Sequence, residues 1–102
     1  MATATLEALT ERVRTRQELP PPHARRQLRL AAGVSLRDVG EVVGVSHEAV
    51  RMWETGERMP RGQNLERYAD VLRAFRNVLP ADVLTAINGD DGKGASEQSE
   101  RR

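Results

Sequence analysis

The sequence predicts an all-α protein: a compact bundle of four to five short helices that contains a helix-turn-helix, with an extra helix at its N-terminus. The length of 102 residues suffices for one domain. Only 3% of the residues are aromatic, so the core must be built from Leu, Val and Ala, which favours packed helices over a β-sandwich. In several segments apolar residues recur three and four positions apart, as they do along one face of a helix.

The first expected helix covers residues 3–18. Thr5 can cap its beginning, because a threonine hydroxyl accepts hydrogen bonds from the N–H groups of a first helical turn. The apolar residues at helical spacing are Leu6, Leu9 and Val13. We expect this helix to lie on the domain as an additional element. The alternatives are a dimer-forming arm and a frayed leader.

Three consecutive prolines at positions 20–22 separate this helix from the next one. Proline breaks a helix, yet it suits the first helical turn, where its missing N–H would have no partner. Residues 1–21 are therefore expected to form an N-terminal helix and a Pro-rich linker. The second helix is expected over residues 22–32, and Gly33 ends it. Its inward-facing residues are expected to be Leu28, Ala31 and Ala32.

Residues 35–56 carry the pattern of a helix-turn-helix, two helices that cross closely around a tight turn. Two short helical segments lie on either side of Gly44, and each begins after a serine that can cap a helix, Ser35 and Ser46. The second segment has an exposed polar face, and such a helix fits the major groove of DNA. The apolar positions of the unit are Leu36, Val39, Val43, Val45, Val50 and Trp53.

Two further helices are expected after this unit, which completes a domain over residues 22–88. Asn64 is the expected N-cap of an amphipathic helix whose apolar face consists of Leu65, Tyr68, Ala69, Leu72 and Phe75. A shorter helix is expected over residues 78–87, with Pro80 at its start. Residues 89–102 are polar and rich in glycine, so they cannot offset their ordering entropy and are expected to form a disordered tail.

Composition excludes several classes of protein. There is no cysteine and there are only two histidines, so we expect no metal and no cofactor. No segment approaches the roughly 20 apolar residues of a membrane span, and we expect a cytoplasmic protein. No carboxylate pair or Ser/His/Asp set stands at a usable spacing, which argues against an enzyme. The net charge of +1 and the pI near 8.4 leave nucleic-acid binding undecided by themselves.

The pattern from about Ala24 to Phe75 resembles the lambda-repressor-like DNA-binding domain of the Cro/C1-type, or XRE, regulators. The motifs that carry the resemblance are RxxLRxAAG at 25–33, VSLRDVGEVVGVS at 34–46 and AVRMWETGERMP at 49–60. The resemblance as a whole covers about half the chain. Three positions depart from the family: Leu36 replaces a frequent glutamine, Gly40 replaces alanine and Met52 replaces a frequent arginine. The phosphate and guanine contacts of the usual glutamine and arginine are therefore not expected.

The resemblance implies which residues meet DNA. Those expected in the major groove are His47, Glu48, Arg51 and Met52. Arg51 can contact guanine O6 and N7 together, and Met52 can touch a thymine methyl. Glu48 can accept from a cytosine amino group or hold Arg51, which lies three residues later on the same helix face. The residues expected to contact phosphates are Arg37, Ser46, Thr55, Arg58, Arg61 and Asn64.

Other positions of the motif are expected to be structural. Trp53 has the same helical phase as Val50, which places it in the core. The resemblance implies a largely buried salt bridge between Arg29 and Glu54 that ties two helices together. Arg25 and Arg26 remain open, either as further phosphate contacts or as solvated side chains.

These observations predict a sequence-specific DNA-binding transcriptional regulator of the repressor kind, which binds double-stranded DNA. One helix reads few base pairs, so a homodimer on a two-fold symmetric operator is expected. The residues first considered for the dimer contact are Val78, Leu79, Leu84 and Ile87, with the apolar residues of the first helix second. Both sets can instead close the monomer's own core. A phage or plasmid accessory factor, an antitoxin with a protein partner, and a protein–protein adaptor are the alternative functions.

Overall fold

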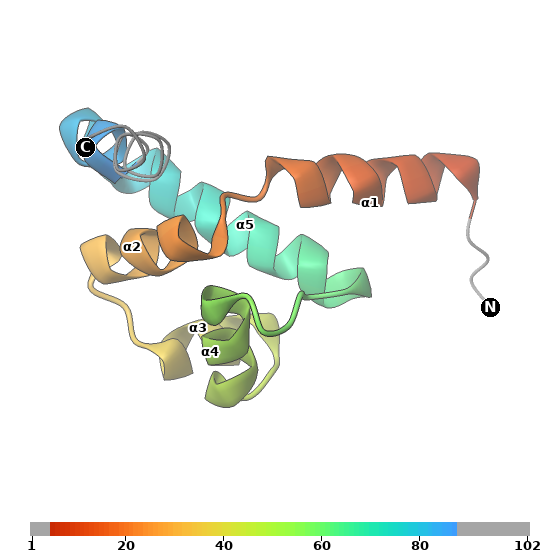
Figure 1. Ribbon diagram of the computed structural model, residues 1–102, viewed down its shortest axis with the longest axis horizontal. Helices are drawn as coiled ribbons and strands as arrows, with labels where there is room; N and C mark the ends of the chain where they lie inside the picture. The colour runs from red at the N-terminus through yellow and green to blue at the C-terminus, as the bar shows by residue number, and fades with distance from the viewer. Residues whose placement is uncertain (1–4, 88–102) are drawn as a thin grey trace, which may run out of the picture.

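The computed structural model describes residues 5–87, and it consists of helices joined by short connections (Figure 1). Residues 81–87 form a sixth helix after five longer ones, and no strand occurs within the described range. The all-α prediction is thereby confirmed. The expected tail at 89–102 lies outside the described residues. The five longer helices are α1 (Leu6–Glu18), α2 (Pro22–Ala32), α3 (Leu36–Val43), α4 (His47–Thr55) and α5 (Gly62–Val78).

Helix α1 packs against α5, but not through the face that the sequence suggested. Thr5 caps it by accepting a hydrogen bond from the Ala8 N–H. Thr15, rather than an apolar residue, is the buried position of α1. The apolar stripe is exposed, with exposed fractions of 79% for Leu6, 48% for Leu9 and 56% for Val13. The first turns of α1 extend beyond the beginning of α5 (Figure 1).

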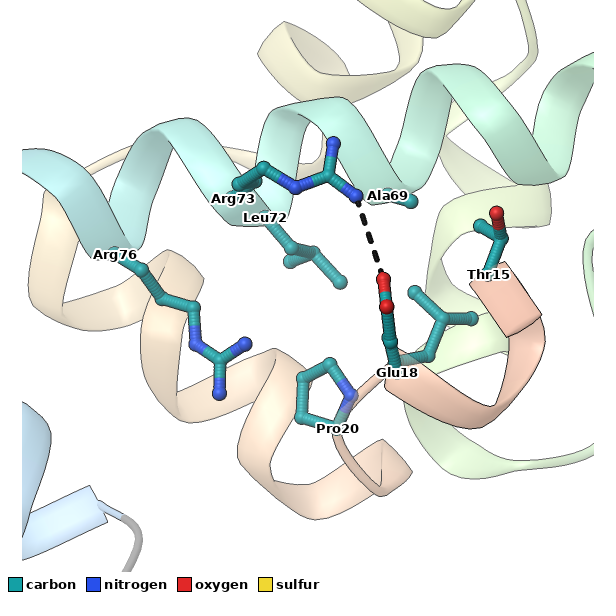
Figure 2. A pocket seen from close by; sticks show the side chains of 8 residues that line it. Thr15, Glu18, Pro20, Ala69, Leu72, Arg73 and Arg76 are labelled. Carbon is teal, nitrogen blue, oxygen red and sulfur yellow. Dashed lines mark ion pairs between the residues drawn. The ribbon is translucent and has the colours of Figure 1, made fainter. Parts of the chain in front are cut away.

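The end of α1 is held on α5 around a small hollow (Figure 2). Leu19 and the buried Pro20 lie on one side of this hollow, and Leu72 of α5 lies on the other. An exposed ion pair of 3.8 Å between Arg73 and Glu18 spans it. Such pairs contribute little to stability, so apolar contacts around Leu72 account for most of the attachment.

Helix α2 begins and ends where the sequence predicts. Pro22 occupies its first position, and Gly33 ends it in the left-handed conformation with a φ of 73°. The inner face differs from the expectation, because Ala31 is exposed while Arg25 is buried. The helix packs against both α4 and α5, which moves the buried face toward its N-terminal half.

Helices α3 and α4 form the expected helix-turn-helix. Ser35 and Asp38 form a capping box at the beginning of α3, and Ser46 caps α4 through the Ala49 N–H. Gly44 ends α3 with a φ of 94°. The inner faces of both helices belong to one core with Trp53, which is buried as predicted.

The crossing depends on Gly40 more strictly than the sequence indicated. The Gly40 carbonyl accepts from the N–H groups of Gly44 and Val45, at 2.7 and 2.9 Å. A Cβ on Gly40 would lie 2.6 Å from the Val45 carbonyl oxygen. A backbone atom cannot move aside as a flexible side chain can, so even a methyl group would disturb the turn.

We therefore predict that Gly40→Ala destabilises the protein by about 1–3 kcal/mol, the usual cost of overpacking. In an open helix the same change would stabilise by about 0.5–1 kcal/mol. Thermal and urea unfolding of the full chain measure the difference. Glu41→Ala, at the exposed neighbouring position, is the control and should change stability by less than about 0.5 kcal/mol. A Gly40→Ala variant as stable as the wild type would contradict the close approach.

Helix α5 begins three residues earlier than the sequence suggested. Arg61 is its N-cap and makes no side-chain capping bond, whereas Asn64 lies inside the first turn. The N-cap assignment of Asn64 is therefore wrong. Arg67 donates from Nη1 to the Val43 carbonyl oxygen at 3.2 Å, which links α5 to the end of α3.

The last described helix closes the monomer core instead of leaving a dimer face. Ile87 is buried in the core cluster, and Leu79, Val83 and Leu84 pack against it. Only Val78 of the first dimer candidates is exposed. Most of these residues are thus used within one chain. None of the described helices is long and apolar enough to cross a lipid bilayer.

Tyr68 lies at the centre of the core. Its ring packs on Trp53 with centroids 4.8 Å apart and planes inclined by 51°. The hydroxyl group is buried and has no hydrogen-bond partner among the described residues. Burial raises the pKa of Tyr68 well above its ordinary value, so the hydroxyl stays neutral at physiological pH.

We predict that Tyr68→Phe leaves stability unchanged or raises it by up to about 1 kcal/mol. The substitution keeps the ring contact with Trp53 and removes a buried polar atom that gains no hydrogen bond on folding. Chemical unfolding compares the two proteins, and Tyr68→Ala, which loses the ring, should cost about 3–5 kcal/mol. A clear loss of stability in Tyr68→Phe would show that the hydroxyl has a stabilising partner.

Candidate nucleic-acid interface

A buried ion pair fixes α4 relative to α2. Arg29 donates from Nε to Glu54 Oε2 at 2.6 Å and from Nη2 to Oε1 at 3.0 Å. Both side chains are buried, with exposed fractions of 10% and 5%. Arg29 also donates from Nη1 to the Val34 carbonyl oxygen at 2.9 Å. Because this fork is bidentate, it fixes orientation as well as distance, and α4 is held at one angle.

A second buried arginine supports the same contact. Arg25 donates from Nε to the Pro20 carbonyl oxygen at 2.7 Å and from Nη1 to the Trp53 carbonyl oxygen at 2.9 Å. Burial lowers the pKa of Arg25, although an arginine remains charged. Arg25 is therefore neither a solvated side chain nor a phosphate contact. The sequence signal for this buried role was the position of Arg25 one helical turn before Arg29 on the same helix face.

The outer face of α4 presents a charged cluster to solvent. His47 and Glu48 are exposed in the first turn. Arg51 donates to Glu48 Oε2 from Nε at 3.0 Å and from Nη2 at 2.6 Å. The hydrogen bond from Arg51 lowers the pKa of Glu48, and the same bond raises the pKa of Arg51. Two of the four predicted base-reading residues, Glu48 and Arg51, are thus paired with each other in the free protein.

Glu57 is a further member of this cluster, and its approach to Arg51 was not indicated by the sequence. Its Oε1 lies 3.6 Å from Arg51 Nη2. The residue follows the end of α4, and helical spacing does not relate it to Arg51, so only the return of the chain after Gly56 brings them together. Two carboxylates thus lie around the Arg51 guanidinium on the outer face of α4.

The other residues at α4 that are predicted to contact DNA differ in how far burial and internal hydrogen bonds engage their side chains. Met52 is half-buried and lines a groove between α4 and the beginning of α5. The Thr55 hydroxyl donates to the Met52 carbonyl oxygen and accepts from the Glu57 N–H. The Ser46 hydroxyl accepts from the Ala49 N–H. Ser46 and Thr55 thus stabilise the two ends of α4, whatever they contact outside it.

Exposed basic side chains lie in the groove beside α4 and in the first turn of α3. Arg58 and Arg61 are exposed and line the groove beside α4, together with the half-buried Asn64. Arg37 is exposed in the first turn of α3. Within the described residues, none of the three arginines forms an ion pair with a carboxylate. Their guanidinium groups are available for phosphate oxygens.

At the beginning of α3, Leu36 has a packing role at the position where the family frequently has glutamine. Its side chain is half-buried and packs against the core cluster. The position therefore contributes to packing instead of to a contact with the DNA backbone.

Among residues 5–87, no three His, Cys, Asp or Glu side chains gather as a metal site would require.

A capped helix pair, locked at one angle with a polar outer face and flanking arginines, defines a helix-turn-helix DNA-binding domain. Residues 26–74 match the helix-turn-helix family HTH_3, the Cro/C1-type or XRE family. The chain thus contains a helix-turn-helix domain of this family, which implies DNA binding and is of a kind that typically has no enzymatic activity. No curated protein and no solved structure gives a significant match.

Proposed function

We propose that this protein is a sequence-specific transcriptional repressor that inserts α4 into the major groove of its operator. The observation that carries the proposal is the combination of a rigidly held α4 with an exposed face of His47, Glu48 and Arg51. Rigid attachment matters because base contacts require side chains placed to within a fraction of an ångström. The proposed DNA-binding domain comprises residues 22–88, with residues 1–21 as a separate N-terminal helix and linker.

The base-reading role falls on few residues. Arg51 is proposed to contact guanine, with Glu48 either accepting from a neighbouring cytosine or orienting Arg51. His47 donates to a base or a phosphate, and Met52 contacts a thymine methyl at the margin of the groove. The carboxylates of Glu48 and Glu57 repel phosphates, so they weaken binding to arbitrary DNA and favour sites that offer Arg51 a guanine.

The phosphate contacts are proposed on both sides of α4. Arg58, Arg61 and Asn64 lie on the side of α5, and Arg37 lies at the beginning of α3, while Ser46 and Thr55 lie at the two ends of α4. Each phosphate neutralised by such a residue steepens the dependence of log K on log salt by about 0.9. A homodimer is proposed because one such helix reads only a few base pairs, and repression follows if the dimer occupies promoter DNA.

Selection of bound duplexes from a random pool tests the proposal directly. The expected result is one enriched motif containing guanine, repeated with two-fold symmetry at a spacing of about one helical turn. A reporter gene with the selected site inside its promoter should then be silenced by the protein. A pool without enrichment would refute sequence-specific binding, and a reporter that is activated would refute repression alone.

Random duplex DNA also distinguishes the proposed regulator from the alternative function, a protein–protein adaptor. An adaptor on this fold would not shift random duplex DNA at low salt, whereas the proposed regulator should bind it weakly and lose that binding as salt rises.

A further inference from the structure

A groove away from α4 lies between α1 and the beginning of α5. Its floor is apolar and consists of Leu9 and Val13 of α1 and of Leu65, which is 2% exposed. Gly62 lines the groove as well, and a Cβ at this position would meet no atom within 4 Å. The groove is therefore open above the first turn of α5.

Three arginines surround this apolar floor: Arg12 and Arg16 from α1 and Arg61 from α5. All three are exposed, and none forms an ion pair with a carboxylate within the described part of the chain. Arg14 of the same helix, by contrast, pairs with Glu11 at 2.6 Å. Three unpaired cations thus lie where the apolar side chains of Leu9 and Val13 are also exposed.

We propose that this groove binds an acidic amphipathic helix of a partner protein. The apolar residues of that helix would cover Leu9 and Val13 above the buried Leu65, and its Asp and Glu residues would face Arg12, Arg16 and Arg61. Recognition of a helix in a groove uses apolar residues at positions i, i+3 or i+4, and i+7. Charge complementarity at the rim then selects acidic partners over basic ones and speeds their association.

The chemistry of the groove favours a protein segment over nucleic acid. The phosphates of a duplex can pair with the three arginines, but a duplex backbone has no apolar side chains to cover Leu9 and Val13. An amphipathic helix satisfies both requirements at once. This groove is distinct from the outer face of α4. It shares only Arg61 with the groove between α4 and the beginning of α5.

The test is selection of displayed helical peptides against the full-length protein. The library keeps apolar residues at i, i+3, i+4 and i+7 and randomises the other positions. Enriched peptides are expected to carry Asp and Glu beside the apolar stripe. The most enriched one, synthesised with a fluorescent label, is expected to bind the protein in an anisotropy titration.

Two variants and one control assign the binding to the groove. Val13→Glu, at an exposed position, and the double variant Arg12→Ala with Arg16→Ala are each expected to lower peptide affinity at least tenfold. Arg14→Ala, on the same helix but outside the groove, is expected to leave affinity unchanged. Circular dichroism and thermal unfolding confirm that each variant is folded.

Three outcomes would overturn the proposal. The first is a selection without acidic enrichment, and the second is a peptide that binds the groove variants as tightly as the wild type. The third is a loss of affinity for random duplex DNA in the Arg12→Ala and Arg16→Ala double variant, together with a shallower salt slope and no peptide binding. That last result would assign the arginines to the DNA footprint.

Discussion

Replacing Glu54 with alanine is expected to lower the free energy of unfolding by about 3–5 kcal/mol. The substitution leaves the guanidinium of Arg29 charged and buried, without the two hydrogen bonds that it makes to the carboxylate. Only the bond to the Val34 carbonyl oxygen would remain. For a domain of this size the melting temperature should fall by more than about 10 °C. Calorimetry and urea unfolding of the full chain measure both quantities.

The matched control is Glu48→Ala, which removes the carboxylate of an ion pair of the same length. Arg29–Glu54 and Arg51–Glu48 both measure 2.6 Å at their closest atoms, but the second pair is about half exposed. Exposed pairs contribute little, so Glu48→Ala should melt with the wild type. If Glu54→Ala also melted within a degree or two of the wild type, the buried pair would not hold α4 in place.

The second large effect is expected on DNA recognition, where Arg51→Ala and Arg61→Ala should differ in kind. Arg51→Ala should reduce affinity for the selected operator by roughly ten- to a hundredfold, while affinity for random duplexes changes little. Arg61→Ala should weaken binding to all duplexes alike and reduce the salt slope by about 0.9. Titrations of both variants with operator and random duplexes at several salt concentrations measure the two patterns.

Neither substitution should affect folding, which makes the comparison clean. The Arg61 side chain makes no capping bond to α5, and Arg51 pairs only with the exposed carboxylates of Glu48 and Glu57. Glu57→Gln is a useful companion, since removing its charge should raise affinity for random DNA. Equal losses of operator and random-duplex affinity in Arg51→Ala would remove Arg51 from base reading.

Local sequence signals located the elements of the fold well. Ser35 and Ser46 are the caps of α3 and α4, and Gly33 and Gly44 end helices in the left-handed conformation. Caps and glycine stops depend on atoms within four residues along the chain, and such patterns can be read directly. The helix start assigned to Asn64 failed because α5 begins at Gly62 without a side-chain cap, a start that leaves no such signal.

Contacts between distant residues were harder to predict. The Arg29–Glu54 pair followed only from the family resemblance, and the buried role of Arg25 was missed. Arg25 bonds to the Trp53 carbonyl oxygen, 28 positions away in the chain. The approach of Glu57 to Arg51 was also unforeseen, because it depends on how the chain turns after α4.

The sequence by itself determined that the chain forms short capped helices with a helix-turn-helix at residues 35–56, because helical spacing, caps and glycine stops are local properties. The tertiary structure alone decided which faces are covered. It buried Arg25, left Leu9 and Val13 exposed beside Arg12 and Arg16, and placed two carboxylates around Arg51. The physical reason is that burial and ion pairing depend on the angles at which helices pack, and those angles follow from side chains that are distant in the chain.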